Sequence, residues 1–383
     1  MFLLELLQNK EVYIWGAGQR GVILHYIFEE RGIDINAFID GDEEKHGTLI
    51  CNTKCFGIND ITLGNNCYVI ISPTGDTTSI FEQLQKKGID SKNIYTMDMI
   101  EQEHYFCPMI EEQSDFKYVH PFNHYESPYP DIREIHKKEA EIFDSNKEVL
   151  DVDFNIPRQF ELLEIMTDID NPPWSKQKTL KYRFYYDNCW FGKGSVDVLY
   201  YMMRILKPKR IIEVGSGFST AAMLDANDKY FEKRIEINSI EPNADRLKSL
   251  LRNDDNIKIQ ECVLQDISLE FFEQLQENDI LFIDSSHVSR VDSDVNYILF
   301  EILPRLKKGV YIHFHDVTYP FEYPSCWIYE GRAYNEMYIL RAFLMNNKKF
   351  SIQFFGDMLM KKYPDKLNEK VNSIAGSIWL RKE

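Results

Sequence analysis

Short runs of β-branched and aromatic residues alternate with helical stretches over residues 1–100. The three clearest runs are residues 11–15, 35–40 and 68–72, and a fourth at 94–97 is long enough for one further strand. Strands separated by helical segments are typical of βαβ units and a parallel sheet. The pattern predicts a doubly wound α/β domain in the first part of the chain.

A second and longer series of strands and helices begins near residue 195. An amphipathic helix is expected at 195–206, because apolar residues recur on one face and Pro208 follows its end. A further helix is expected at 334–345. Strands are expected at 210–214, 237–241, 257–263, 280–284 and 310–316, followed by 350–355 and 377–381. The series predicts a seven-stranded doubly wound sheet.

The residues between the two series are expected to form a connector. Prolines at 108, 121, 128 and 130 fall among many tyrosines and phenylalanines there. Asp131 is a candidate N-cap of a linker helix, and a second helical stretch is expected at 160–166. We therefore predict an α/β protein with two Rossmann-like doubly wound domains, residues 1–100 and 171–383, joined by an aromatic and helical connector, residues 101–170.

Chain length and charge agree with two domains and limit the partners. With 383 residues and about 150 residues per domain, a single core is not expected. The 61 acidic and 44 basic side chains give a formal net charge of −17, which disfavours nonspecific binding to nucleic acid. No apolar run reaches the roughly 20 residues of a membrane span, so membrane insertion is not expected.

The first residues and the cysteines indicate a cytoplasmic protein. Residues 1–7 lack a basic segment and include Glu5 within their apolar stretch, which predicts a helix rather than an export signal. The 7 cysteines are an odd number spread along the chain, which is typical of reduced thiols. Cys51 and Cys55 lie close together, but no second pair of cysteines or histidines at zinc spacing accompanies them.

A turn with two glycines at residues 213–219 is the main candidate binding site. It follows a buried strand and opens a helix, where small residues let a ligand approach the backbone and the helix N-terminus. The next strand ends at Glu241, whose carboxylate could accept from both hydroxyls of a ribose. Asp266, at the end of the third strand, could accept from an adenine amino group. A tight βα connection without a ligand is the alternative interpretation of the turn alone.

The chain from about residue 170 to 383 resembles the class I S-adenosylmethionine-dependent methyltransferases. Within that class it is similar to a bacterial branch of uncharacterised methyltransferases, on the segments Tyr185-Tyr-Asp-Asn188, Lys207-Pro208, Glu213 to Thr220, His313-Phe-His-Asp316 and Phe321-Glu-Tyr-Pro324. The resemblance implies S-adenosylmethionine as the cofactor. By position, the cofactor-binding residues would be Glu213, Gly215, Ser216, Gly217, Phe218 and Ser219 at the glycine turn, Glu241 at the ribose, Asp266 at the adenine, and Asp284 at the end of the fourth strand.

Four polar side chains at the ends of the fourth and fifth strands form the candidate catalytic group: Asp284, His287, His315 and Asp316. Transfer to a hydroxyl needs a base that takes its proton or a metal that lowers its pKa. His287 is the candidate base, and Asp284 and Asp316 are the other candidate catalytic residues.

Three of these residues are also candidate metal ligands. Asp284, His315 and Asp316 could bind Mg²⁺ or Mn²⁺, because the region looks like the metal-dependent sugar and catechol O-methyltransferases. Those enzymes carry an acidic or Asp-Asn pair where this chain has His-Asp. A general base and a metal site are thus two interpretations of this group, and the third is that these polar residues have no catalytic role.

An aromatic and polar stretch after the fifth strand, residues 319–336, is where a cap over the acceptor would lie. Sugars are commonly held by aromatic faces with carboxylates and amides, although ordinary packing fits the same composition. The substrate candidates are Glu322 and Trp327 in this stretch, His315 before it, and Tyr186 and Asn188, which by resemblance close over the methionine end of the cofactor.

A second glycine motif lies near the start of the chain. Gly16, Gly18 and Gly21 follow a strand and precede a helix, and Asp40 ends the next strand, where a ribose-binding acid is expected. The segment resembles the small Rossmann-like domains of bacterial sugar acetyltransferases, which bind nucleotides or nucleotide-sugars. A scaffold or dimerisation module, and hence a homodimer, is the alternative. A complete dehydrogenase is disfavoured, because no Tyr-x-x-x-Lys pair follows the motif before the connector.

The sequence thus predicts an S-adenosylmethionine-dependent methyltransferase. The expected reaction is O-methylation of a saccharide or sugar-nucleotide, with no nucleic-acid partner. Two alternatives stay open. One is a non-catalytic regulatory protein that binds a nucleotide and the cofactor. The other is an NAD-dependent sugar-modifying oxidoreductase or epimerase that uses the N-terminal domain.

Overall fold

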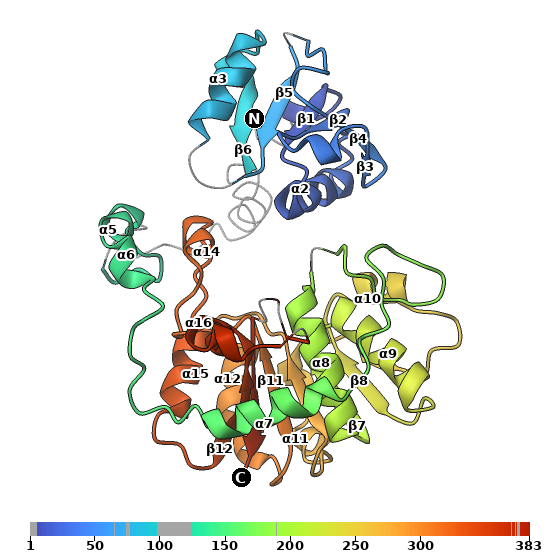
Figure 1. The fold of residues 1–383 in the computed structure, drawn as a ribbon, viewed down its shortest axis with the longest axis vertical. Helices are drawn as coiled ribbons and strands as arrows, with labels where there is room; N and C mark the ends of the chain where they lie inside the picture. Colours follow the sequence, from blue (N-terminus) through green and yellow to red (C-terminus); the bar gives the residue numbers. More distant parts are fainter. Residues whose placement is uncertain are drawn as a thin grey trace. The chain divides into compact units, whose positions relative to one another are not determined.

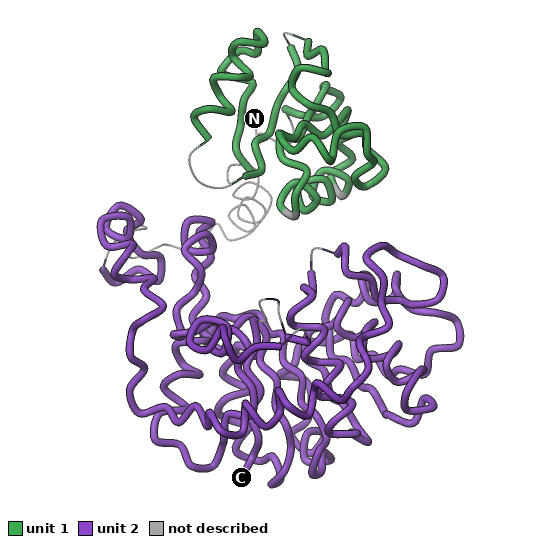
Figure 2. The backbone as a smooth tube through the Cα atoms, viewed as in Figure 1, with its two compact units in different colours: residues 1–121 green, residues 122–383 purple. Residues whose placement is uncertain are grey.

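The computed structural model describes residues 6–97 apart from 65 and 74–76, and residues 125–383 apart from 189, 369, 372, 374 and 375. The chain forms two compact units, residues 1–121 and 122–383 (Figure 2). The sequence predicted boundaries at 100 and 170 and a connector between them. Of that connector, residues 101–124 lie outside the described residues, and the remainder lies in the second unit.

The first unit is built on a six-stranded sheet in the order β3-β4-β2-β1-β5-β6. The strands are β1 (Val12–Trp15), β2 (Ala37–Ile39), β3 (Leu49–Ile50), β4 (Thr53–Phe56), β5 (Tyr68–Ile71) and β6 (Ile94–Thr96). Neighbours run parallel except β3 and β4.

Helices cover both faces of this sheet. Side chains alternate along β1, so Val12 and Ile14 share a core with α2 (Gln19–Glu30). Tyr13 and Trp15 share the opposite core with α3 (Thr78–Lys86). Two 3₁₀ turns, η1 (Glu43–Lys45) and η2 (Ser91–Asn93), complete the described elements. The predicted doubly wound domain is confirmed.

The hairpin of β3 and β4 was not predicted. Its two-residue turn, Cys51-Asn52, has φ of +48° and +64°. Positive φ at both turn residues matches the twist of the flanking strands, but the usual sequence signal for it is Asn-Gly or Asp-Gly. Strands β3 and β4 are short and partly polar, so they show no hydrophobic pattern from which a hairpin could be predicted.

The second unit contains the predicted seven-stranded sheet, in the order β12-β13-β11-β10-β7-β8-β9. Its strands are β7 (Arg210–Val214), β8 (Glu236–Ile240), β9 (Lys258–Gln260), β10 (Ile280–Ile283), β11 (Tyr311–His315), β12 (Phe350–Phe355) and β13 (Ser377–Lys382). Only β13 is antiparallel to its neighbours within this sheet. The central strands β10 and β11 are buried along their whole length, so β10 is entirely apolar and β11 is apolar apart from His313 and His315.

The strand order reverses at β7. The chain continues from β7 to β8 and β9 on one side and returns to β10 and β11 on the other. Such a reversal leaves a crevice at the carboxyl ends of the strands, which is the usual ligand position in open α/β sheets.

The remaining helices of the second unit mostly pack around this sheet, whereas α14 (Ser325–Tyr329) stands away from it (Figure 1). They are α8 (Lys193–Leu206), α9 (Phe218–Tyr230), α10 (Asp245–Leu250), α11 (Leu269–Phe272), α12 (Asp294–Asn296), α13 (Leu303–Arg305), α14 (Ser325–Tyr329), α15 (Glu336–Leu344) and α16 (Gly356–Lys362), with short turns η3 (Leu264–Asp266) and η5 (Pro364–Lys366) and a π-helical segment η4 (Tyr297–Ile302). The helices expected at 195–206 and 334–345 are α8 and α15. No helix in the described ranges is long and apolar enough to cross a membrane.

The described part of the predicted connector contains three helices. Asp131 caps α5 (Ile132–Lys137) as predicted, since its Oδ1 accepts from the Arg133 N–H at 2.9 Å, and α6 (Glu139–Ile142) follows. The third helix, α7 (Ile156–Thr167), packs on β12, where Gln159 Oε1 accepts from the Phe355 N–H at 2.8 Å. The last part of the expected connector is therefore built into the second unit.

Candidate active site

The turn at residues 213–219 joins β7 to α9 between the ends of β8 and β10. Gly215 has φ +77°, in the left-handed region that favours glycine. A Cβ atom there would lie 2.0 Å from the carbonyl oxygen of Asp284. The Gly215 N–H donates to the Ile240 carbonyl at 3.0 Å, and the Asp284 N–H donates to the Val214 carbonyl at 2.8 Å. Glycine is therefore needed for the turn to fit between the strand ends.

Glu213 lies beneath the turn. It is fully buried, and its two carboxyl oxygens lie 2.6 Å from the hydroxyls of Ser219 and Thr220. Burial raises the pKa of Glu213 to about 8 and outweighs these two hydrogen bonds. Glu213 and Ser219 thus brace the first turn of α9, and Glu213 is mostly protonated at neutral pH.

The other turn residues differ in what they offer to a ligand. The Ser216 N–H donates to Glu241 Oε2 at 3.1 Å, whereas the buried Ser216 hydroxyl has no hydrogen-bond partner among the described residues. The Gly217 N–H donates to Thr220 Oγ1 at 3.1 Å. Phe218 is buried against Tyr185. Ser216 is the turn residue with unused hydrogen-bonding capacity.

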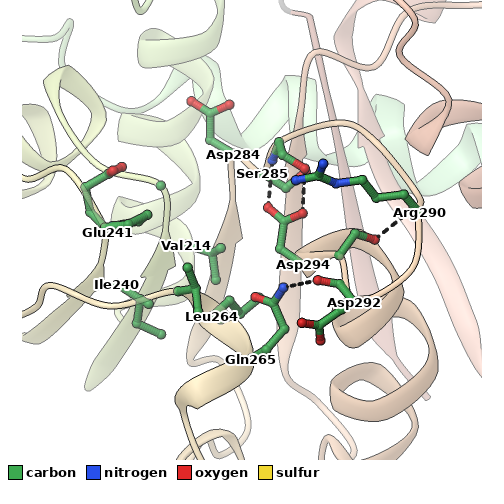
Figure 3. Close-up of a pocket in the computed structure, with 15 residues that line it drawn as sticks. Val214, Ile240, Glu241, Leu264, Gln265, Asp284, Ser285, Arg290, Asp292 and Asp294 are labelled. Carbon is green, nitrogen blue, oxygen red and sulfur yellow. Dashed lines mark hydrogen bonds between the residues drawn. The ribbon is translucent and has the colours of Figure 1, made fainter. Parts of the chain in front are cut away.

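A cavity of about 390 Å³ opens at the carboxyl ends of β7, β8 and β10 (Figure 3). Its walls include Gly215, Glu241, Leu264, Gln265, Asp284 and Arg290. Glu241 is held by the Asn243 N–H, which donates to its Oε1 at 2.9 Å. Carboxylates thus face the cavity from the ends of two different strands.

Asp266 does not line this cavity, which corrects the sequence prediction. The turn η3 places Leu264 and Gln265 in the cavity wall and leaves Asp266 exposed. The Gln265 side-chain amide donates to the Asp292 carbonyl on the facing wall (Figure 3). Gln265 takes the place that was predicted for Asp266.

A polar cluster lies where β10 and β11 end, and Asp284 belongs to both the cluster and the cavity. His287 Nε2 lies 3.5 Å from Asp284 Oδ1 and 3.5 Å from Asp316 Oδ2. One potential ligand atom from each of the three residues lies within 4.8 Å of the others. His287 Nδ1 lies 2.9 Å from Glu336 Oε2, at the start of α15. The structure therefore brings together the three predicted catalytic residues and adds a third carboxylate.

The backbone is unusual at two of these residues. His287 has φ +60° and Asp316 has φ +56°. Left-handed backbone is uncommon outside glycine, although Asn, Asp and His adopt it more often than other residues. Both loops turn sharply just beyond their strands, and these turns set the positions of the two side chains.

The carboxylates control the charge of the imidazole. Burial acts to lower the pKa of His287, but the Asp284 and Glu336 carboxylates outweigh it and raise that pKa well above 6.5. Burial acts to raise the pKa of Asp284, but interactions with His315 and His287 outweigh it and lower that pKa. The cluster therefore favours a positive charge at its centre, whether a proton or a cation.

His315 is less central than predicted. Its Nε2 lies 3.5 Å from Asp316 Oδ1, but the ring is buried beside Phe191, with 5.1 Å between centroids. The ligand atoms that gather belong to Asp284, His287 and Asp316. Among the described residues, the candidate metal set thus contains His287 in place of His315.

Two predicted substrate residues hold the local structure before α8. The Tyr186 hydroxyl donates to Asp197 Oδ1 at 2.8 Å. Asn188 Oδ1 accepts from the Phe191 N–H at 2.7 Å, and its amide donates to the Tyr185 carbonyl at 2.7 Å. Neither residue lines the cavity.

The other two lie in the segment after β11. Trp327 packs against Tyr334, with 5.9 Å between ring centroids, and the Tyr334 ring lies 5.1 Å from that of His287. Glu322 accepts a hydrogen bond from the Tyr338 hydroxyl. The aromatic segment is thus connected to the polar cluster through Tyr334.

The N-terminal motif forms a tight strand-to-helix turn. Gly16 has φ +102°, and a Cβ on Gly21 would lie 1.8 Å from the Gly16 carbonyl oxygen. A Cβ on Gly18 would meet nothing within 4 Å. Asp40 Oδ2 accepts from the Ala17 N–H at 2.6 Å and pairs with Lys45 at 3.0 Å. Gly16 and Gly21 are required by the fold, whereas Gly18 leaves open space at the N-terminus of α2.

The residues of the site that were not predicted include Gln265, Arg290 and Glu336. Gln265 and Arg290 line the cavity from turns and loops that carry no periodic signal. Glu336 directly precedes an apolar helical run, but nothing in the sequence places it beside His287.

The fold and the site define the class of this protein. A family model described as a methyltransferase domain matches residues 212–317, from the glycine turn to the polar cluster. Over these residues the second unit is similar to a methyltransferase domain. An uncharacterized protein of Archaeoglobus fulgidus is 36% identical over 168 residues, which are 42% of this chain and 75% of the archaeal protein. The chain belongs to the same family as that protein.

Two solved structures show a weaker likeness. The SAH-bound methyltransferase PaMTH1 of Podospora anserina is 16% identical, with 70% of this chain and 100% of that chain covered and a TM-score of 0.34. The methyltransferase FkbM of Methylobacillus flagellatus KT is 12% identical, with 100% and 93% covered and a TM-score of 0.31. The class and family rest on the family model and the archaeal relative.

Proposed function

We propose that the protein is an S-adenosylmethionine-dependent O-methyltransferase that acts on a hydroxyl of a saccharide or sugar-nucleotide. The observation that supports this proposal is that Asp284 belongs both to the cavity wall and to the polar cluster. Its carboxylate lines the cavity beside Gly215 and also lies 3.5 Å from His287 Nε2. A cofactor in the cavity would therefore end beside the polar cluster.

The cavity suits a nucleoside that carries a charged amino acid. Its volume of about 390 Å³ lies within the range of about 300–1,000 Å³ for small-molecule sites. Glu241 offers carboxylate oxygens to a ribose, Gln265 offers an amide to a base, and Ser216 offers its unpaired hydroxyl to the amino-acid part. When bound, S-adenosylmethionine supplies an electrophilic methyl group.

The chain's own residues would align and deprotonate the acceptor. His287 Nε2 faces Asp284 and Asp316, so it is the atom that would take the hydroxyl proton, and because its pKa is raised it does so only in molecules whose ring is neutral. Mg²⁺ or Mn²⁺, if required, would be held by Asp284, His287 and Asp316 and would acidify the hydroxyl. Whether the cluster binds a proton or a metal cation, the carboxylates of Asp284 and Asp316 stabilise the positive charge.

The segment after β11 supports a saccharide acceptor. Tyr334 presents its ring next to His287, Trp327 packs against Tyr334, and Glu322 lies in the same segment. Aromatic faces with nearby carboxylates suit the apolar faces and hydroxyls of sugars.

For the N-terminal unit, binding of a nucleotide or nucleotide-sugar is supported by the open space at Gly18. Backbone N–H groups at the start of the twelve-residue helix α2 favour a phosphate there. The Asp40 carboxylate is engaged with Ala17 and Lys45, and a ribose would have to share it.

Calorimetry with S-adenosylhomocysteine tests the cofactor site. Glu241→Gln should weaken binding about tenfold or more, because a charge-assisted hydrogen bond to the ribose is lost. Asp266→Asn is the matched control and should leave the affinity unchanged, because Asp266 lies outside the cavity. Absence of binding by the unmodified protein would refute the proposal.

Methyl transfer from labelled S-adenosylmethionine to a panel of saccharides and sugar-nucleotides tests the reaction itself. Incorporation that depends on His287 supports the enzyme. Binding of S-adenosylhomocysteine without transfer to any acceptor would favour a non-catalytic binding protein.

A further inference from the structure

The two ring nitrogens of His287 have different surroundings. Nδ1 lies 2.9 Å from Glu336 Oε2, the length of a hydrogen bond. Nε2 lies 3.5 Å from carboxylate oxygens of both Asp284 and Asp316, at the outer limit of such contacts. One nitrogen is therefore firmly bonded, and the other faces two acids at a longer distance.

Glu336 is itself held in place. It is 2% exposed, and its Oε1 accepts from the Ser285 hydroxyl at 2.7 Å. The main chain adds to this, because the His287 carbonyl accepts from the N–H groups of Asn335 at 3.0 Å and Glu336 at 3.1 Å. The beginning of α15 is thus fastened to both the backbone and the ring of His287.

A buried polar group needs hydrogen-bond partners. Glu336 stands at the first position of α15, where the helix N-terminus favours negative charge, and it has an imidazole and a hydroxyl as partners. By contrast, the buried His313 has neither ring nitrogen paired among the described residues. Burial of a histidine in this unit therefore does not by itself bring a carboxylate to its ring, and the pairing of His287 with Glu336 is a specific feature.

We propose that Glu336 is the positioning residue of the reaction: it keeps a proton on His287 Nδ1 and turns Nε2 toward Asp284 and Asp316. This proposal deepens the proposed function and rests on it for the role of Nε2. The Glu336 carboxylate accepts from the Nδ1–H in either charge state of the ring, so Nε2 is the nitrogen left to face the acceptor hydroxyl or a cation. The aromatic segment that ends at Tyr334 leads directly into Glu336, so the acceptor side and the imidazole are built on one piece of chain.

Substitutions at Glu336 separate positioning from simple packing. Glu336→Gln retains an oxygen for the Nδ1–H and an amide that can donate to Ser285, so it should keep kcat within about threefold. Glu336→Leu retains the volume but no acceptor, and should lower kcat about 100-fold with little change in the KM for S-adenosylmethionine. Glu301→Leu, which removes an exposed carboxylate of η4 paired with Arg305, is the matched control. Equal losses in the Gln and Leu variants would overturn the proposal.

A spectroscopic measurement tests the proposal without turnover. Two-bond ¹⁵N–¹H correlation spectra of the ¹⁵N-histidine-labelled full chain report which nitrogen of a neutral ring carries the proton, and His287→Asn assigns the signal. The unsubstituted protein should show the Nδ1–H form at a pH where the ring is neutral, and Glu336→Leu should lose that preference. An Nε2–H form in the unsubstituted protein would overturn the proposal even if every variant misfolds. Failure of S-adenosylhomocysteine binding, in contrast, would overturn only the proposed function.

Discussion

Replacing Glu213 by glutamine should change how stability depends on pH. The Glu213 carboxyl is fully buried, with a pKa of about 8 in the folded protein and an ordinary value of 4.5. Between these values the unfolded chain releases a proton that the folded chain keeps. The free energy of unfolding therefore falls as pH rises from 4.5 to 8, and the full contribution is present only below 4.5.

The size of the effect follows from the difference in pKa. Each pH unit costs about 1.4 kcal/mol, so the loss is about 3 kcal/mol at pH 7. Glutamine is neutral at every pH and can exchange one hydrogen bond with each of Ser219 and Thr220. The stability of Glu213→Gln relative to the unsubstituted protein should therefore rise by about 4 kcal/mol between pH 5 and pH 8.

Urea unfolding followed by tryptophan fluorescence measures this difference at each pH. Trp15 is in the first unit, and the other four of the 5 tryptophans are in the second, so the signal mainly reports the unit that contains Glu213. Glu261→Gln, which removes an exposed acid paired with Lys248, is the control and should follow the unsubstituted protein. A stability difference for Glu213→Gln that stays constant from pH 5 to pH 8 would refute the reasoning.

Further predictions concern the two glycine turns and the cluster. Gly215→Ala should destabilise the second unit and abolish S-adenosylhomocysteine binding, because its Cβ would lie 2.0 Å from the Asp284 carbonyl oxygen. Gly18→Ala should have the same thermal stability as the unsubstituted protein, because its Cβ would meet nothing within 4 Å. Thermal unfolding of the two variants tests this difference. His287→Asn, which tolerates left-handed backbone, should lower turnover about 100-fold with unchanged S-adenosylhomocysteine affinity, and unchanged turnover would remove His287 from the mechanism. Chelation by EDTA distinguishes the two roles of the cluster: a loss of activity restored by Mn²⁺ indicates that a bound cation acidifies the acceptor hydroxyl, and full activity in EDTA indicates that His287 takes the proton without a cation.

The sheets could be predicted because their central strands are buried on both faces. Residues 280–283 are buried and apolar over their whole length, and residues 311–315 are buried and apolar apart from His313 and His315, which leaves a clear sequence pattern. The convergence of Asp284, His287 and Asp316 followed from the same reasoning, because neighbouring parallel strands end at one edge.

The errors lie where the chain leaves regular structure. The turn η3 decides that Gln265 rather than Asp266 faces the cavity, and a one-residue rotation of this kind has no signature in composition. Glu336 reaches His287 through a loop and a helix start, so its role depends on tertiary contacts alone. Similarly, His315 belongs to the correct strand, but the ring packs beside Phe191 while His287 takes the central position.

The contact between Gly215 and the Asp284 carbonyl has a consequence for how this enzyme can change. The cofactor turn and the start of the catalytic loop touch through main-chain atoms, and hydrogen bonds from β7 to β8 and β10 hold them in register. Under the proposed function, the spacing between the methyl donor and Asp284 would thus be a property of the sheet. Exchange of the segment from residue 317 to 334 would then alter the contacts with the acceptor without moving the glycine turn, provided that Glu336 keeps its bond to His287.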